Sequence, residues 1–255
     1  MTIRVGVTGA AGRMGGQVLS AIEDRGDCEL AFAVNRAPTA DRNGETEIEA
    51  AAEFPLLLDE RDPGVVVDFS GSESALEYAR ACAEAGVPFV TGTTGFDEDE
   101  RDRLRAASED VAVLHSPNFA RGVQVLDRLV EEVVRKLPGY DVELIETHHN
   151  AKRDAPSGTA NGLLSTIEDA GAFEGRTHGR AGDAPRETGE IGVHAIRAGN
   201  VTGQHEVLVA GDYEELRLTH RVEDRGVFAA GALDAAVWLV GRDPGWYEFA
   251  EVIES

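Results

Sequence analysis

The sequence contains almost no lysine. Only two of its 24 basic residues are lysines, Lys136 and Lys152, and the others are arginines, against 47 acidic residues. The formal net charge of −23 at pH 7 excludes a general affinity for nucleic acid and for anionic membrane surfaces, because both would repel the chain.

Abundant carboxylates without lysine have two explanations. One is adaptation to very high salt, where a Debye length of about 3 Å at 1 M lets crowded carboxylates coexist. The other is an acidic protein from a GC-rich genome, in which arginine replaces lysine. We favour a halophilic protein, because GC bias does not account for the acidity itself.

Cysteine and long apolar runs are also scarce. Cys28 and Cys82 stand outside any CxxC pattern, which sets aside a zinc site made from these two alone but leaves a disulfide between them open. No apolar run reaches 18 residues, and the start lacks the basic and apolar regions of a signal peptide. We therefore expect a soluble, cytoplasmic protein.

The first 120 residues alternate apolar strands with helices. Strands are predicted at 3–8, 29–35, 65–69, 89–91 and 111–114, and helices after residue 12, at 72–85 and at 97–107. Repeated strand–helix units of this kind predict a doubly wound parallel sheet, hence an α/β fold.

The pattern changes after Asn118. Helices are predicted at 122–137, 159–170 and 228–239, strands at 142–147, 192–197, 204–210 and 214–221, and a polar loop at 171–189. Strands in series joined by short turns indicate a second, α+β domain with a mixed or antiparallel sheet.

A glycine-rich turn, Gly9-Ala10-Ala11-Gly12-Arg13-Met14-Gly15, joins the first strand to the first helix. Such a turn brings backbone N–H groups and the positive end of a helix to a pyrophosphate. A tight strand–helix turn without a ligand is the alternative, but the strand before it and the helix after it favour dinucleotide binding.

Asn35 and Arg36 stand at the end of the second strand, 20 residues beyond Gly15. An acidic residue is expected there for NADH, whereas Asn35 would not repel a 2′-phosphate and Arg36 could pair with it. This favours NADPH, with NADH also accepted. The alternative is that the two residues only open the following loop.

Two further loops follow strands of the first domain: Gly92-Thr93-Thr94-Gly95 and Ser116-Pro117-Asn118-Phe119. Ligands of doubly wound sheets bind at the carboxyl ends of the strands. Both loops are therefore candidates to hold the nicotinamide end of a dinucleotide, although each is also an ordinary loop signal.

The segment from Glu146 to Thr159 holds two adjacent histidines, His148 and His149, together with Lys152. It ends in Ser157-Gly158-Thr159, which opens a helix whose N–H groups can bind a carboxylate. Positive charge concentrated in a strongly acidic protein indicates a small anionic substrate.

Two other interpretations of this segment are a metal site and a surface loop with chance histidines. The sequence offers neither HExxH nor a cysteine partner, so no metal is expected. His194, His205 and His220 alternate with apolar residues and are interpreted as ordinary sheet residues.

The chain resembles the dihydrodipicolinate reductase family of diaminopimelate and lysine biosynthesis. Five segments carry the resemblance in order: VTGAAGRMG at 7–15, VDFS at 67–70, GTTGF at 92–96, ETHHNAKRDAPSGTA at 146–160 and RAGNVTGQH at 197–205. The resemblance implies NAD(P)H-dependent reduction of 4-hydroxy-tetrahydrodipicolinate to tetrahydrodipicolinate.

The resemblance also assigns roles. His148 is the acid/base residue, Lys152 the proton donor, and His149 a substrate contact, while Gly158 and Thr159, next to Ser157, bind a substrate carboxylate. It implies a Rossmann domain of residues 1–120 plus 226–255, a substrate and oligomerisation domain of residues 121–225, and a homotetramer. The dinucleotide is assigned to Gly9–Met14, Gly92–Thr94, Ser116–Phe119 and, at the 2′-phosphate, Arg36.

Two rival functions remain at this stage. One is another nicotinamide-dependent dehydrogenase on the same fold. The other is a non-catalytic dinucleotide sensor, which would not need Lys152 beside paired histidines at a helix start.

Overall fold

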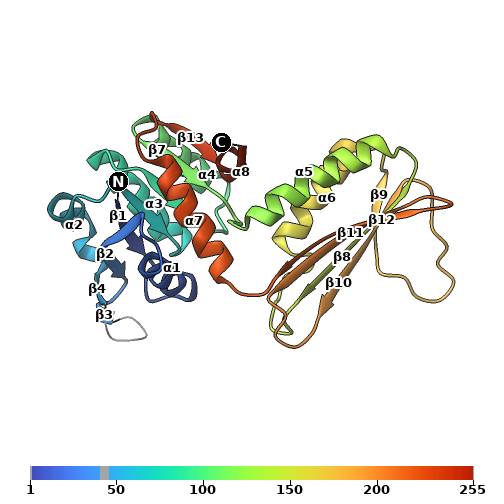
Figure 1. Ribbon diagram of the computed structural model, residues 1–255, viewed down its shortest axis with the longest axis horizontal. Helices are drawn as coiled ribbons and strands as arrows, with labels where there is room; N and C mark the ends of the chain where they lie inside the picture. The colour runs from blue at the N-terminus through green and yellow to red at the C-terminus, as the bar shows by residue number, and fades with distance from the viewer. Residues whose placement is uncertain (1, 41–45, 255) are drawn as a thin grey trace. The chain divides into compact units, whose positions relative to one another are not determined.

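The computed structural model describes residues 2–40 and 46–254. They form two compact units, which we call unit 1 (Met1–Ala120 with Arg225–Ser255) and unit 2 (Arg121–Asp224) (Figure 1). The chain thus returns to unit 1 after completing unit 2.

Unit 1 is built on a sheet with the strand order β13-β7-β6-β5-β1-β2-β4-β3. Every pairing is parallel except that of β3 with β4 at one edge. The strands are β1 Ile3–Thr8, β2 Cys28–Asn35, β3 Thr39–Ala40, β4 Glu47–Ala50, β5 Val65–Asp68, β6 Phe89–Thr91, β7 Ala112–His115 and β13 Gly245–Glu248. The helices are α1 Arg13–Glu23, α2 Phe54–Arg61, α3 Ser72–Ala85, α4 Glu98–Ala106, α7 Gly226–Leu239 and α8 Phe249–Glu254, with short 3₁₀ turns at Ala51–Glu53 and Ala107–Glu109.

Helices cover both faces of this sheet, which explains the continuous apolar run of β5. Val65 and Val67 pack in one hydrophobic core with residues of α1, α7 and α8. Val66, which points the other way, packs in a second core with residues of α2 and α3. A strand buried on both faces needs no polar alternation, and the sheet confirms the predicted doubly wound fold.

The order of the strands defines the binding edge of unit 1. From β1 the chain passes to β2 on one side and later to β5 on the other. The carboxyl ends of β1 and β5 therefore flank the switch point of the topology, where ligands of such sheets bind.

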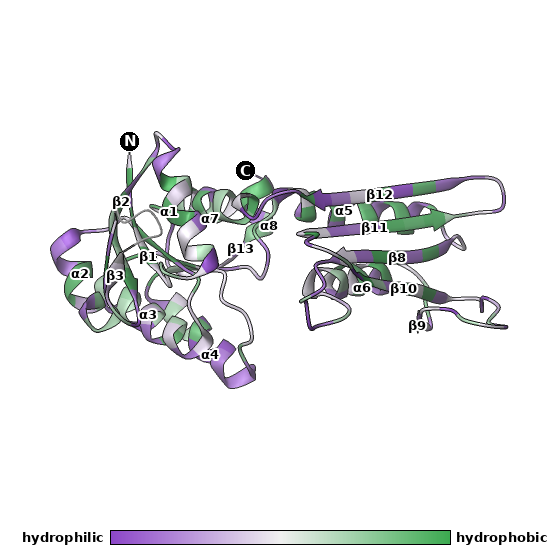
Figure 2. Cartoon of the chain, turned by 90° about the horizontal axis from the view of Figure 1, so that it is seen from below, coloured by the Kyte–Doolittle hydropathy of each residue, from purple (hydrophilic) through white to green (hydrophobic). Residues whose placement is uncertain are grey.

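Unit 2 is a five-stranded mixed sheet, β12-β11-β8-β10-β9, in which β8, β9 and β10 are parallel and β11 is antiparallel to both β8 and β12. Its strands are β8 Asp141–His148, β9 Gly175–His178, β10 Glu190–Arg197, β11 Gly203–Ala210 and β12 Glu215–Val222, and its helices are α5 Arg121–Lys136 and α6 Gly158–Ala170. The two helices pack together on one face of the sheet (Figure 1). Figure 2 shows hydrophilic and hydrophobic residues alternating along β12, as expected for a sheet covered on one face.

Several short elements were not predicted from the sequence. The loop expected at 171–189 contains the polar edge strand β9, and α7 is followed by β13 and α8 rather than ending the chain. The sequence of β9, Gly-Arg-Thr-His, has no apolar periodicity, so pairing with β10 alone makes it a strand. Both cysteines are buried free thiols, which excludes the disulfide left open above.

Candidate active site

The carboxyl end of β8 brings together four titratable side chains of unit 2. His148 ends β8 and lies opposite Arg197, which ends the neighbouring parallel strand β10. Glu146, on the same face of β8, lies opposite His205 of the antiparallel strand β11. Three adjacent strands thus bring these four side chains to one end of the sheet.

Glu146 is the centre of this group. Its side chain is fully buried and accepts four hydrogen bonds: from Nδ1 of His148 at 2.6 Å, from both Nη atoms of Arg197 at 2.8 Å, and from the backbone N–H of Ser157 at 3.1 Å. Burial raises the pKa of the Glu146 carboxyl, but the bonds from Arg197 and His148 outweigh burial and leave that pKa below its ordinary value. Glu146 is therefore an ionised acceptor.

The ionised Glu146 fixes the tautomer of His148. Burial lowers the pKa of the His148 imidazole, and the hydrogen bond with Glu146 offsets burial only in part. The ring is therefore neutral near pH 7, with its proton on Nδ1 facing the carboxylate. Nε2 is left with a lone pair that can take up a proton.

Lys152 lies on the loop between β8 and α6. Its Nζ is 2.8 Å from Oδ1 of Asp154, and its backbone N–H donates to the carbonyl of His149 at 3.1 Å. Arg197 also donates from Nη2 to the backbone carbonyl of Asp154 at 2.6 Å. The ion pair of Arg197 with Glu146 thus anchors the loop that carries the only lysine in this part of the sequence.

Helix α6 begins beside this group. Ser157 is its N-cap, and Oγ of Ser157 accepts from the N–H of Ala160 at 3.2 Å. Because the N–H of Ser157 donates to Glu146, the start of α6 is tied to the end of β8. The predicted carboxylate-binding residues Gly158 and Thr159 form the first turn, where a helix favours anions.

His205 lies in the sheet, on β11, as predicted, but it also belongs to the group around Glu146. It is buried, its Nε2 lies 3.0 Å from Oγ of Ser157, and its ring centroid lies 5.2 Å from that of His148. Burial is the main cause that lowers the pKa of His205 to about 4, and the neighbouring His148 disfavours a second positive charge there. No role was predicted from the sequence for His205, Arg197 or Glu146, although all three lie within the motif segments. The sequence does not show how their strands pair, and that pairing brings the three side chains together.

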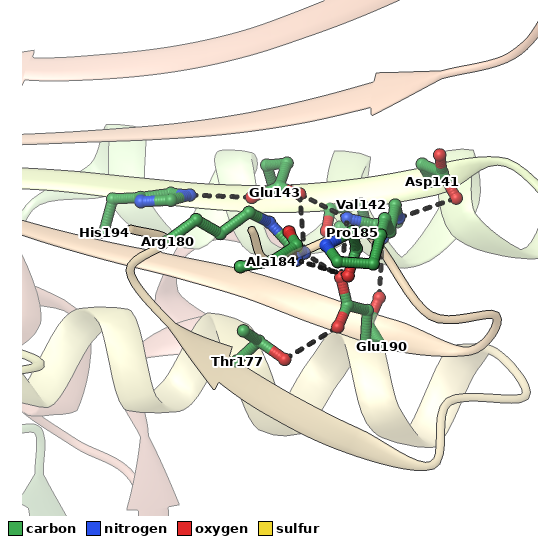
Figure 3. Close-up of polar contacts among 10 residues, drawn as sticks. Asp141, Val142, Glu143, Thr177, Arg180, Ala184, Pro185, Glu190 and His194 are labelled. Carbon is green, nitrogen blue, oxygen red and sulfur yellow. Dashed lines mark hydrogen bonds and ion pairs between the residues drawn. The ribbon is translucent and has the colours of Figure 1, made fainter. Parts of the chain in front are cut away.

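A second charged network lies on the opposite face of the same sheet (Figure 3). Glu143 of β8 accepts from Arg186 and lies 2.7 Å from Nε2 of His194, while Glu190 accepts from Oγ1 of Thr177 at 2.8 Å and pairs with Arg180. These contacts fasten the 179–189 loop and β9 to the sheet. Since side chains alternate along a strand, Glu143 points away from the Glu146 group.

The glycine turn of unit 1 has the geometry of a phosphate-binding turn. Gly9 has φ +68°, and a Cβ there would lie 2.4 Å from the backbone oxygen of Phe69, while a Cβ on Gly15 would lie 2.2 Å from the oxygen of Gly9. Gly12 is the N-cap of α1 and has no side chain to occupy the helix N-terminus. Ala11, Gly12 and Arg13 are exposed, so this turn fits the pyrophosphate of a dinucleotide.

The other predicted cofactor residues lie at the same edge of the sheet. Asn35 ends β2 and is followed by the exposed Arg36, and Thr94 is exposed after β6. The loop after β7 is held by its own bonds, from Oγ of Ser116 to the carbonyl of Asn118 at 2.8 Å, and Phe119 is buried in the core. Of the remaining predicted residues, Ala10 lies in the glycine turn and Met14 in the first turn of α1, while Gly92 and Thr93 follow β6 and Pro117 follows β7.

Neither a cluster of metal-ligating side chains nor a membrane-spanning helix is present within residues 2–40 and 46–254, the part of the chain that the structure describes. Within these ranges no group of three or more histidine, cysteine, aspartate or glutamate side chains is arranged to hold a metal ion. The helices within the same ranges are all too short or too polar to cross a membrane.

Comparison with known proteins identifies similar chains over the full length. Residues 3–119 match the family described as dihydrodipicolinate reductase, N-terminus, and residues 122–253 match dihydrodipicolinate reductase, C-terminus. The chain is 52% identical over 252 residues to a 4-hydroxy-tetrahydrodipicolinate reductase of Haloarcula marismortui, covering 99% of each chain. It is 50% identical over 253 residues to that of Natronomonas pharaonis, covering 98% of this chain and 100% of the relative.

Solved structures agree in fold. A dipicolinate-bound dihydrodipicolinate reductase from Paenisporosarcina sp. TG-14 superposes with a TM-score of 0.79 at 22% identity, covering 97% of this chain and 98% of that one. A diaminopimelate dehydrogenase of C. glutamicum gives a TM-score of 0.58 at 15% identity, covering 99% and 96%. At these identities the likeness shows a shared fold.

Proposed function

The chain belongs to the dihydrodipicolinate reductase family, and we propose that it reduces 4-hydroxy-tetrahydrodipicolinate to tetrahydrodipicolinate with NADPH or NADH, in diaminopimelate and lysine biosynthesis. One observation carries this conclusion: the two family matches together span residues 3–119 and 122–253. The family resemblance drawn from the sequence motifs is confirmed.

The dicarboxylate substrate is assigned to the end of unit 2 where β8 meets α6. The first turn of α6 at Gly158 and Thr159 offers N–H groups and the positive end of the helix to one carboxylate. Lys152 and His149 on the adjoining loop add donors for an anion. Ser157 holds this turn in place through its bonds to Glu146 and Ala160.

Two side chains are assigned to proton transfer. NAD(P)H, when bound, would supply the hydride for reduction, and the 4-hydroxyl group of the substrate leaves as water. Negative charge then grows on the substrate, and Lys152 can neutralise it by donating a proton from Nζ. His148, whose Nε2 carries a lone pair, can accept a proton and return it, while Glu146 stabilises the charged imidazole that forms.

The dinucleotide is assigned to the carboxyl edge of the unit 1 sheet. The turn from Gly9 to Met14 would hold the pyrophosphate, and Arg36 the 2′-phosphate of NADPH. The loops at 92–94 and 116–119 would hold the nicotinamide end. The exposed position of Arg36 directly after β2 supports this assignment.

We further propose a cytoplasmic homotetramer that assembles through the sheet of unit 2. The face of that sheet away from α5 and α6 carries partly exposed apolar residues, among them Ile196, which is 45% exposed. Two buried free thiols agree with a reducing compartment.

The direct test mixes the protein with NADPH or NADH and synthetic 4-hydroxy-tetrahydrodipicolinate and follows the loss of nicotinamide absorbance. Turnover that needs both components, and that falls in Lys152→Ala, supports the proposal. Turnover of NADPH only with other substrates would indicate a different dehydrogenase. NADPH binding without any turnover would indicate a sensor.

A further inference from the structure

Asp68 is a buried carboxylate for which the function proposed above has no use. It ends β5 at the switch point of the unit 1 sheet, and its side chain has no exposed surface. It belongs to the VDFS motif at 67–70, which carries the family resemblance but received no role. A charge in a core position needs compensation from its neighbours.

Hydroxyl groups supply that compensation. Oδ1 of Asp68 accepts from Oγ1 of Thr8 and from Oγ of Ser70, both at 2.6 Å, and from the N–H of Ser70 at 3.2 Å. Oδ2 accepts from Oγ1 of Thr91 and of Thr93, both at 2.7 Å. The donors thus come from the ends of three adjacent strands, β1, β5 and β6.

Backbone hydrogen bonds near Asp68 connect the same three strands. The N–H of Gly92 donates to the carbonyl of Asp68 at 2.9 Å, and the N–H of Phe69 donates to the carbonyl of Thr8 at 3.2 Å. The N–H of Thr93 donates to Oγ1 of Thr91 at 3.1 Å. The glycine turn after β1 and the 92–94 loop after β6 are therefore both fixed to one residue.

The bonds to Asp68 also restrict what Thr93 can offer a ligand. A threonine hydroxyl has one proton, and the hydroxyl of Thr93 donates its proton in the hydrogen bond to Asp68. Its oxygen can then only accept a hydrogen bond. An amide N–H₂ group, such as that of a nicotinamide carboxamide, is a donor that suits such an oxygen.

We propose that Asp68 is a positioning residue for the dinucleotide site. It holds the 92–94 loop at a fixed distance from the glycine turn and orients the Thr93 hydroxyl as an acceptor at the nicotinamide end. This inference rests on the proposed function, which assigns both segments to the dinucleotide. An apolar residue at position 68 would pack like Val65–Val67 but would leave the four hydroxyls without an acceptor.

The test compares the binding of NADPH with that of 2′,5′-ADP, a fragment without the nicotinamide half. The dissociation constant of NADPH is measured from nicotinamide fluorescence, and that of the fragment by competition. For Asp68→Asn we expect NADPH binding to weaken about 10- to 100-fold, the range of a hydrogen bond to a charged group. Binding of 2′,5′-ADP should change by no more than about twofold, since the backbone bond from Phe69 to Thr8 still holds the glycine turn that, with Arg36, is assigned to this fragment.

Asp68→Asn also changes the charge of the site. A matched pair of variants at Thr93 tests the same contact without changing any charge. Thr93→Val keeps the volume but loses the hydroxyl, which is both the donor to Asp68 and the proposed acceptor for the ligand, and should weaken NADPH binding. Thr93→Ser keeps the donor and should bind NADPH nearly normally. The double variant Asp68→Asn with Thr93→Val should bind NADPH no more weakly than Thr93→Val alone, because without the Thr93 hydroxyl Asp68 has nothing left to orient.

Other results overturn the inference. Equal weakening of NADPH and 2′,5′-ADP would show a general loss of structure, and unchanged NADPH binding would show no positioning role. If Asp68→Asn does not fold, as judged by its melting temperature, the Thr93 pair decides alone. A wild-type protein that bound neither NADPH nor NADH would contradict the proposed function itself, whereas a fully active wild type with unaffected variants would contradict only the role of Asp68.

Discussion

Oε2 of Glu146 lies 2.6 Å from Nδ1 of His148, and the same carboxylate is held by Arg197 through two bonds of 2.8 Å. His148, the residue proposed for proton transfer, is thus oriented by a buried anion, which is itself kept ionised by a cation from the neighbouring strand. Removing one member of this chain of contacts alters the protonation of His148 as well as its direction.

Glu146→Gln should lower kcat about 10- to 100-fold, because it replaces a charge-assisted hydrogen bond to His148 by a neutral one. NADPH affinity should stay unchanged. Steady-state kinetics and NADPH titration check both statements. Glu143→Gln is the matched control, since Glu143 lies on the same strand and contacts an arginine and a histidine on the other face. If both variants lost activity equally, the effect would be one of folding.

Lys152→Ala and His148→Ala should each lower kcat by roughly 10²–10⁴, the usual contribution of a positioned acid or base. Binding of NADPH should hardly change, because the residues proposed to bind the nucleotide lie in unit 1. Single-turnover rates and fluorescence titration measure the two effects separately. Near-normal kcat in both variants would refute the assignment of the proton-transfer residues.

Arg36→Ala should weaken NADPH binding while leaving NADH binding nearly unchanged. The guanidinium is the candidate partner of the 2′-phosphate, which NADH lacks. Dissociation constants for the two cofactors give the answer. Equal losses for both would instead indicate a damaged fold.

Stability should fall as the pH is lowered from about 6.5 to about 4, in part because of His205. Its pKa is 6.5 in an unperturbed state and about 4 in the folded protein, so the unfolded chain binds the proton first and acid favours unfolding. A shift of this size corresponds to about 3 kcal/mol. His205→Gln cannot titrate and should lose less stability across this window.

Urea unfolding at a series of pH values measures this difference. His178→Gln is the control, since His178 is an exposed histidine of β9. A wild-type curve parallel to that of His205→Gln between pH 6.5 and 4 would contradict the prediction.

Melting temperature, activity and assembly should all rise with KCl into the molar range. Because the net charge is −23, the surface carboxylates repel one another. The Debye length that limits this repulsion is about 30 Å at an ionic strength of 0.01 M but only about 3 Å at 1 M. The KM of the anionic substrate should rise at the same time, because salt also screens Lys152. Thermal melts and sedimentation across a KCl series test this. Equal stability and assembly in dilute buffer would leave GC-biased composition as the explanation.

The sequence by itself determined much of this protein. The unbroken valines before Asp68 predicted a buried parallel strand, and the glycine turn between a strand and a helix predicted the nucleotide half. The run from Glu146 to Thr159 identified the family and placed His148 and Lys152 together, because neighbours in a continuous segment stay close in any fold.

Only the tertiary structure decided which distant residues complete these sites. Arg197 lies 51 residues beyond Glu146 in the chain, and His205 lies 57 residues beyond His148, yet strand pairing brings each of them within contact. The four hydroxyls around Asp68 meet in the same way, across three strands. Periodicity reports which face of an element is buried, but the register between strands depends on the packing of the whole sheet, and that register makes Glu146 and Asp68 the centres of their networks.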